Sequence, residues 1–99
     1  MLITLETPEV QLYYAAVQRI NLEHFAGTSY VPRDVWSIAQ GPRYIRIAHG
    51  GAHSFIDRLG GDVLKPASFA KPAKHARGNI FDADGGLKGM GPYGPAYLR

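Results

Sequence analysis

The strongest constraint in this sequence is a pair of glycines set between two segments of alternating polarity. Residues 43–48 alternate polar and apolar side chains, which is typical of a half-buried β-strand. Gly50-Gly51 suits a two-residue hairpin turn, because glycine accepts the positive φ angles that primed turns require. Residues 52–57 supply the returning strand. The sequence therefore predicts a β-hairpin over residues 43–57.

The register of this hairpin decides which side chains share a face. The expected pairs are Tyr44–Asp57, Ile45–Ile56, Arg46–Phe55, Ile47–Ser54, Ala48–His53 and His49–Ala52. Successive side chains of a strand point to opposite faces. One face then carries Ile45, Ile47 and Ile56, and we expect it to meet a helix. The other face is expected to expose Tyr44, Arg46, His53 and Phe55.

Two further strands are predicted beside the hairpin. Residues 58–61 form a turn and residues 62–65 a third strand. The expected pairs here are Ile56–Val63 and Phe55–Leu64. Pro66 cannot donate a backbone hydrogen bond, so the third strand ends there or lies at an edge. Residues 35–38 add a short strand before the hairpin.

One helix is predicted over residues 8–25. Thr7 can cap it, and Pro8 suits the first helical position. Apolar residues recur at the spacing of one helical face, at Val10, Tyr13, Tyr14, Val17 and Ile20. Gly27 is a plausible stop. This helix either lies on the sheet as part of the core or offers a groove to a partner, and the core is the favoured interpretation.

These elements predict an α+β fold. One N-terminal helix packs on a three- to four-stranded antiparallel meander, followed by an irregular Gly/Pro-rich C-terminal wrap. The 99 residues form a single small domain. Its expected parts are a helix (8–25), a meander (35–68), and a basic loop with a Gly/Tyr-rich tail (69–99).

Composition excludes several classes of site. The chain has no cysteine, so disulfides, thiolate nucleophiles and cysteine-based metal sites are absent. No apolar run approaches the roughly 20 residues that span a bilayer, and the first residues do not resemble a signal peptide. We expect a soluble, intracellular protein with no membrane partner. A domain of this size has little room for a deep cofactor pocket, so no cofactor is expected.

Charge is distributed unevenly along the chain. Residues 41–99 hold nine basic residues against four acidic ones, whereas residues 1–40 are net acidic. The segment from Lys65 to Arg77 contains no acid, and its basic groups suit a track of phosphates. Aromatic rings on the exposed sheet face would add stacking surfaces for bases. The expected binding residues are Tyr44, Arg46, Phe55, Lys65, Lys71, Lys74, His75 and Arg77. The alternative is a solvated loop over an ordinary sheet face.

Other candidate sites are weaker. His49 and His53 are four residues apart, but the glycines between them break the helix that a metal pair would need. In the expected register they point to opposite faces. Asp82-Ala83-Asp84-Gly85 resembles the start of a calcium loop, yet proline occupies the position of its last ligand. Neither a metal site nor an enzymatic activity is expected.

The tail from Gly89 to Arg99 contains Tyr93, Tyr97 and Leu98, and is too apolar to be a spacer. It is expected to dock on its own domain or, alternatively, on a neighbouring subunit.

A resemblance extends over about residues 43–99. It rests on five stretches: Tyr44-Ile-Arg-Ile, His53-Ser-Phe-Ile-Asp57, Gly61-Asp-Val-Leu-Lys-Pro-Ala67, Ala73-Lys-His-Ala-Arg-Gly-Asn-Ile-Phe-Asp82 and Gly91-Pro-Tyr-Gly-Pro-Ala-Tyr-Leu98. In these the chain resembles a group of short proteins encoded by tailed bacteriophages. The resemblance implies a phage origin and a place in the host cytoplasm or, alternatively, in the virion. It carries over no catalytic residue.

Together these observations predict a small non-enzymatic phage accessory protein. It would bind nucleic acid, or an acidic host protein associated with nucleic acid during host takeover, through the basic loop and the exposed sheet face. The alternative is a virion structural or interaction module whose tail docks on neighbouring phage subunits.

Overall fold

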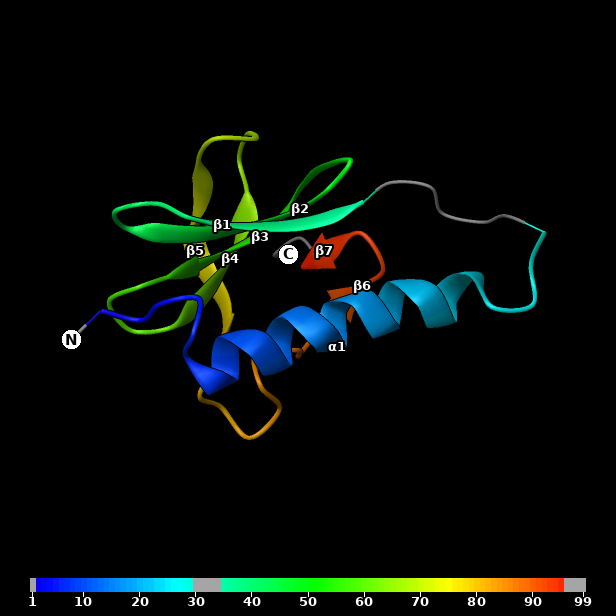
Figure 1. Cartoon of the computed structure of the whole chain (residues 1–99), viewed down its shortest axis with the longest axis horizontal. Coiled ribbons are helices and arrows are strands. Elements are labelled where there is room, and N and C mark those ends of the chain that lie inside the picture. The colour runs from blue at the N-terminus through cyan, green and yellow to red at the C-terminus, as the bar shows by residue number, and fades with distance from the viewer. Residues whose placement is uncertain (1, 30–34, 96–99) are drawn as a thin grey trace.

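A computed structural model describes residues 2–29 and 35–95. The main helix, α1, runs from Pro8 to Phe25, which confirms the predicted bounds. It lies beneath an antiparallel sheet (Figure 1). The α+β class is therefore confirmed.

The main sheet has five strands in the order β1-β2-β3-β4-β5, one more than the largest number expected. The strands are β1 (Trp36–Gln40), β2 (Tyr44–His49), β3 (Gly51–Asp57), β4 (Asp62–Pro66) and β5 (Pro72–Asn79). The expected basic loop is wrong over residues 72–79, because this stretch forms the fifth strand. Most of its side chains are exposed or half-buried, so it carries little of the apolar periodicity by which a strand is predicted. Backbone pairing with β4 holds it in place.

The predicted register is confirmed from Tyr44–Asp57 to Ile47–Ser54, and between β3 and β4. It is wrong by one residue near the turn, where Ala48 pairs with Ala52 instead of His53. A bulge inserts His53 into β3 at this point. A bulge changes the direction in which a side chain points, and here it brings His53 to the same tryptophan that His49 contacts, as described below.

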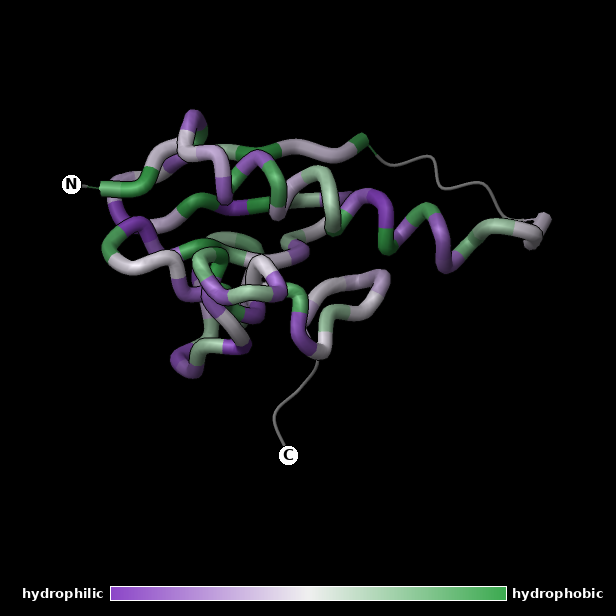
Figure 2. The backbone as a smooth tube through the Cα atoms, turned by 90° about the horizontal axis from the view of Figure 1, so that it is seen from below, coloured by the Kyte–Doolittle hydropathy of each residue, from purple (hydrophilic) through white to green (hydrophobic). Residues whose placement is uncertain are grey.

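The core lies between the helix and one face of the sheet. From the sheet come Ile45, Ile47 and Ile56, which are fully buried, as expected. From the helix come Val10, Tyr13 and Val17. Figure 2 shows the pattern behind this arrangement, since hydrophobic and hydrophilic residues alternate along the helix. Burial of each large aliphatic side chain contributes about 1.5–3 kcal/mol.

Two polar residues fix the N-terminal segment. Thr7 occupies the N-cap position but does not cap the helix with its side chain. Its Oγ1 accepts a hydrogen bond from the Thr4 amide at 3.0 Å instead. Arg58 is 9% exposed and donates to the carbonyl oxygens of Ile3, Gly41 and Pro42 at 2.7, 2.8 and 3.1 Å. This buried guanidinium joins the N-terminus to the β1–β2 turn.

The C-terminal segment forms a second, two-stranded sheet of β6 (Met90–Gly91) and β7 (Gly94–Pro95). The Asn21 side-chain amide of α1 donates to the Pro92 carbonyl at 2.9 Å, and Gly94 and Pro95 are buried. A Cβ at Gly94 would lie 2.5 Å from the carbonyl oxygen of His53, so only glycine permits this approach. The tail therefore docks on its own domain up to residue 95. Tyr97 and Leu98 lie outside the described residues.

Within the ranges 2–29 and 35–95, no helix is long and apolar enough to cross a membrane.

Candidate functional site

A cleft of about 330 Å³ lies on the face of the sheet opposite the core. The β1–β2 turn forms one side of it, and the turn between β4 and β5 reaches it through Ala70. The cleft is lined by Ala39, Gln40, Gly41, Pro42, Arg43, Tyr44, Arg46, Phe55 and Ala70. Three of the predicted binding residues, Tyr44, Arg46 and Phe55, therefore meet at one place.

Arg46 and Phe69 form a cation–π pair beside this cleft. The guanidinium carbon of Arg46 lies 4.3 Å from the centre of the Phe69 ring. Phe69 is 53% exposed and Arg46 is half-buried. Among the described residues, no carboxylate pairs with Arg46. The pair thus offers a flat surface that carries an unneutralised positive charge.

Arg43 is neutralised within the chain. Its Nε and Nη2 atoms donate to the two carboxylate oxygens of Asp57, both at 2.9 Å. These hydrogen bonds hold the pKa of Asp57 below its ordinary value. The same guanidinium lies 5.4 Å from the Tyr44 ring. Arg43 therefore orders the rim of the cleft, and Arg46 is the cation that remains for a ligand.

Phe55 is not the exposed stacking surface that was expected. It pairs with Arg46 as predicted, but its side chain is only 2% exposed. The Tyr44 ring stands edge-on to it at 6.3 Å between ring centres. Phe55 forms the floor of the cleft. Half-buried Tyr44 and exposed Phe69 are the aromatic groups that a ligand can reach.

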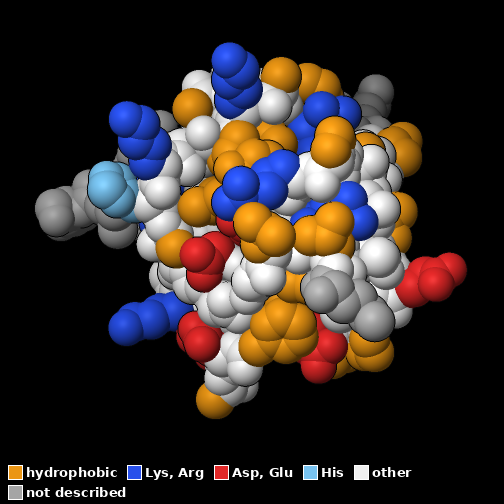
Figure 3. All heavy atoms as spheres, turned by 90° about the vertical axis from the view of Figure 1, so that its left-hand side faces the viewer, with side chains coloured by type: hydrophobic (Ala, Val, Ile, Leu, Met, Phe, Trp, Pro, Cys, Tyr) orange, Lys and Arg blue, Asp and Glu red, His pale blue; other side chains and the backbone are white. Residues whose placement is uncertain are grey.

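Most of the predicted basic residues lie on the β4–β5 hairpin. Lys71 is exposed in the turn, and Lys74 and His75 are exposed on β5. Arg77 is half-buried and donates to the His75 carbonyl at 2.7 Å. No described carboxylate forms an ion pair with Lys71 or Lys74. In Figure 3, most Lys and Arg atoms gather in the upper half of the face shown, with hydrophobic atoms between them.

Lys65 does not belong to this group. Its ammonium donates to the Pro95 carbonyl at 3.0 Å, which ties β4 to the C-terminal hairpin. Lys65 therefore contributes to the fold at this contact, whereas an outward phosphate contact was expected. The remaining cations also have a structural interpretation, because β5 is an edge strand and lysines on an edge prevent pairing with other chains.

His53 is buried instead of exposed, so the expectation for this residue is wrong. It is 3% exposed, and its Nδ1 lies 2.8 Å from the Ser54 hydroxyl. That hydroxyl also accepts a hydrogen bond from the Tyr13 phenol at 2.8 Å. Nε2 of His53 has no hydrogen-bond partner among the described residues. Burial lowers the pKa of His53 to about 4, with smaller contributions from the charges of His49 and Lys65.

Trp36 separates this group from the outside. Its ring stacks on His49 at 4.2 Å and lies 5.3 Å from His53. Both histidines therefore contact one tryptophan, and their expected placement on opposite faces is wrong. Ser54 is fully buried and Tyr13 and His53 are almost so, which places the Tyr13–Ser54–His53 chain within the core.

In the part of the chain that the structure describes, no three His, Asp or Glu side chains gather in a way that could hold a metal ion. The segment Asp82–Gly85 is a turn. A carboxylate oxygen of Asp84 accepts a hydrogen bond from the Gly86 amide at 2.9 Å.

A sequence model for a family of unknown function (DUF7717) matches residues 11–90 of the chain. The chain belongs to the DUF7717 family. No curated protein and no solved structure matches it. The family match covers all five strands of the main sheet, and therefore the whole cleft and the β4–β5 hairpin.

Sequence reasoning missed Arg43, which lines this DUF7717 cleft, and Phe69, which lies beside it. Phe69 was assigned no role because it lies in a turn. A large apolar residue between Ser68 and Ala70 could have indicated that its ring contacts another part of the chain. Arg43 was predicted as the first residue of a strand and was assigned no binding role, whereas in the structure it lies just before β2. Its pairing with Asp57 depends on the twist of the sheet, which periodicity does not describe.

Proposed function

We propose that this DUF7717 protein is a small non-enzymatic module that binds single-stranded nucleic acid across the cleft and the β4–β5 hairpin. The observation that carries the proposal is the Arg46–Phe69 pair, an accessible cation on an aromatic ring, next to a cleft on the same face. Bases stack on aromatic rings and on guanidinium planes in proteins that bind single strands.

The exposed cations would supply the electrostatic part of binding, through contacts with phosphates. Lys71 and Lys74 lie on the same hairpin as Phe69, one at its turn and one on its second strand. Neither is neutralised by a described carboxylate. A nucleic-acid strand whose base stacks near Phe69 can therefore bring its phosphates to these ammonium groups. Release of the counterions of those phosphates favours binding.

The size of the cleft favours a single base over a duplex. Its volume of about 330 Å³ is at the lower end of the range for small-molecule sites. A duplex hides its base faces within the stack, whereas a single strand presents them. Tyr44, which lines the cleft, and the exposed Phe69 beside it would supply the rings for such a face.

The biological setting is part of the proposal. The resemblance of residues 43–99 to short proteins of tailed bacteriophages supports a role in the cytoplasm of an infected host, during host takeover. An acidic protein that imitates a phosphate chain is the alternative ligand for the same surface, since it would meet the same cations.

Fluorescence anisotropy with labelled single-stranded DNA, single-stranded RNA and a duplex of matched length tests the proposal. With about three phosphates neutralised, the affinity for a single strand should fall about 20-fold between roughly 50 and 200 mM salt. Arg46→Ala should weaken binding about tenfold or more through lost stacking and charge. Absence of single-strand binding at low salt would overturn the proposal.

A matched pair of variants distinguishes binding at this surface from binding that follows net charge alone. Lys74→Glu and Lys88→Glu change the net charge equally, and both lysines are exposed. Lys88 lies in the segment after β5, outside the hairpin. Lys74→Glu should weaken binding and reduce the salt dependence, whereas Lys88→Glu should have little effect. Equal losses would show that binding follows overall charge and not this surface.

A further inference from the structure

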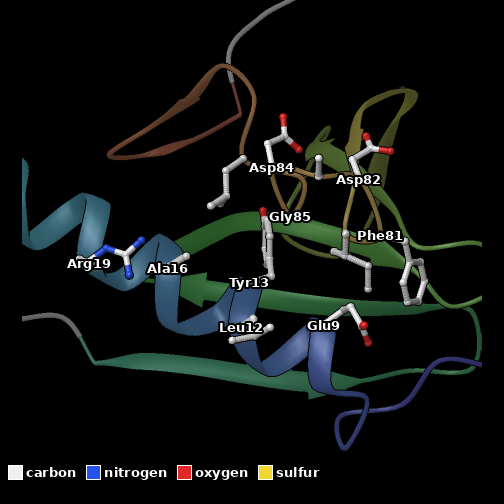
Figure 4. A pocket seen from close by; sticks show the side chains of 12 residues that line it. Glu9, Leu12, Tyr13, Ala16, Arg19, Phe81, Asp82, Asp84 and Gly85 are labelled. Carbon is white, nitrogen blue, oxygen red and sulfur yellow. The ribbon is translucent and has the colours of Figure 1, made fainter.

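A second groove, of about 440 Å³, lies between α1 and the segment that follows β5 (Figure 4). It is distinct from the cleft on the sheet, with which it shares no residue. The helix forms one wall through Leu12, Ala16 and Arg19, and Phe81 stands at the other. Leu12 is 70% exposed and Phe81 is 53% exposed, so two large apolar side chains at this groove remain in water.

Four helix residues at this groove follow one line along α1. Glu9, Leu12, Ala16 and Arg19 recur at intervals of three, four and three residues. They form a seam on one side of the helix, with apolar residues at its two central positions and charged residues at its two ends. Leu12 projects from the seam, while Ala16 is buried and lines the hollow next to it. The seam thus presents both a large side chain and a space beside a small one.

We propose that a second copy of this chain occupies the groove, with the two α1 helices antiparallel about a two-fold axis at the level of residue 14. This axis sets Leu12 of one copy against Ala16 of the other, so each leucine enters the hollow of its partner. The same axis sets Glu9 of one copy against Arg19 of the other. A two-fold interface requires such a self-complementary surface.

The charges of the helix wall are self-complementary, which favours a second copy over an unrelated partner. Glu9 and Arg19 are ten residues apart, about 15 Å along the helix, and have opposite charge. An antiparallel copy therefore places opposite charges together at both ends of the leucine contact. Arg19 already lies 3.7 Å from Glu23, but their side chains are 64% and 69% exposed. Such an exposed pair is weak and can exchange partners.

Sedimentation equilibrium over a range of protein concentrations tests the proposal. The full-length protein should dimerise, and Leu12→Asp should weaken the dimer at least about tenfold. Leu22→Asp is the matched control, because Leu22 is a second exposed leucine of α1, at 66%, and does not line the groove. Circular dichroism checks that both variants keep the helix. A monomer at the highest concentrations, or equal effects of the two variants, would overturn the proposal.

Charge reversal gives a test that folding defects cannot imitate. Glu9→Arg alone places arginine against Arg19 at both ends of the dimer, and Arg19→Glu alone places glutamate against Glu9. Each variant should therefore be monomeric. An equimolar mixture of the two restores an Arg–Glu pair at both ends and should form a heterodimer. A mixture that stays monomeric would contradict the antiparallel arrangement.

This inference does not rest on the proposed function, because the groove and the nucleic-acid surface have no residue in common. Loss of the dimer with nucleic-acid binding intact, or the reverse, identifies which of the two proposals has failed.

Discussion

The buried His53 makes stability depend on pH in a predictable direction. In the folded protein its pKa is about 4, against an ordinary value of 6.5, chiefly because burial disfavours the charged ring. In the unfolded chain the ring is in water and binds a proton near pH 6.5. Between these two values the unfolded state binds more protons than the folded state. Stability must therefore fall as pH falls through this window.

The magnitude follows from the two pKa values. Each pH unit between them costs about 1.4 kcal/mol. Acidification from pH 7 should lower the free energy of unfolding by about 2 kcal/mol at pH 5 and by about 3 kcal/mol at pH 4. Below that value His53 is protonated in the folded protein too, and its contribution no longer changes. For a domain of this size, such a loss is a large part of the total stability.

Urea denaturation at several pH values, followed by circular dichroism, measures this loss. His53→Gln cannot titrate, so its free energy of unfolding should lack the decrease of about 2 kcal/mol between pH 7 and pH 5. Any constant cost of the substitution does not affect this comparison. His75→Gln is the control, because it makes the same substitution at an exposed histidine.

Other groups add acid sensitivity of their own. The pKa of Asp57 is lowered by its hydrogen bonds with Arg43, so its contribution is present above its ordinary pKa of 3.8 and is lost at more acid pH. The pH range in which the contribution of Asp57 is lost lies below the window between pH 7 and pH 5. If His53→Gln and the wild-type protein lost stability in parallel over that window, the account of a neutral, buried His53 would be refuted.

Two substitutions test the packing that holds the two candidate surfaces in place. Gly94→Ala should cost about 2–3 kcal/mol, because φ is +129° and the new Cβ would lie 2.5 Å from the His53 carbonyl oxygen. Gly51→Ala has open space around its Cβ position and should be nearly neutral in the same thermal denaturation. Arg58→Lys should cost about 1–3 kcal/mol, since a lysine cannot reproduce the fork that reaches three carbonyl oxygens. An Arg58→Lys variant as stable as the wild type would show that this network contributes little.

The helix and the central hairpin could be predicted because their patterns are redundant. In α1, the capping position, Pro8 and the apolar spacing all indicate the same element, and its bounds are confirmed. In the hairpin, the alternation of Ile45 and Ile47 opposite Ile56 permits one register, since a shift of one residue would expose the core face.

The errors arise where the pattern is weak. Two consecutive glycines allow the chain to turn at either position, so the bulge at His53 left no signal in the sequence. The same bulge made His53 a core residue. β5 was missed because an edge strand with exposed Lys74 and His75 needs almost no apolar residues. Phe55 was placed on the correct face, but it is buried there, in a cleft that the β4–β5 turn reaches through Ala70.

The candidate site was predicted only in part, because a local pattern groups residues of neighbouring strands but does not show contacts between distant segments. Alternation along the strands grouped Tyr44 with Arg46, and that grouping is confirmed by the cleft. The contact between Arg46 and Phe69 joins residues 23 positions apart through the turn between β4 and β5. No local pattern predicts such a contact, because it depends on how the hairpin bends over the sheet.

In the proposed function, the Arg46–Phe69 pair and the cations of the β4–β5 hairpin together bind a single nucleic-acid strand. NMR titration of the isotopically labelled protein with a short single-stranded oligonucleotide tests it most directly. Chemical shifts should change at Tyr44, Arg46, Phe69, Lys71 and Lys74 and stay constant along α1. Changes confined to the helix groove, or no changes at low salt, would contradict it.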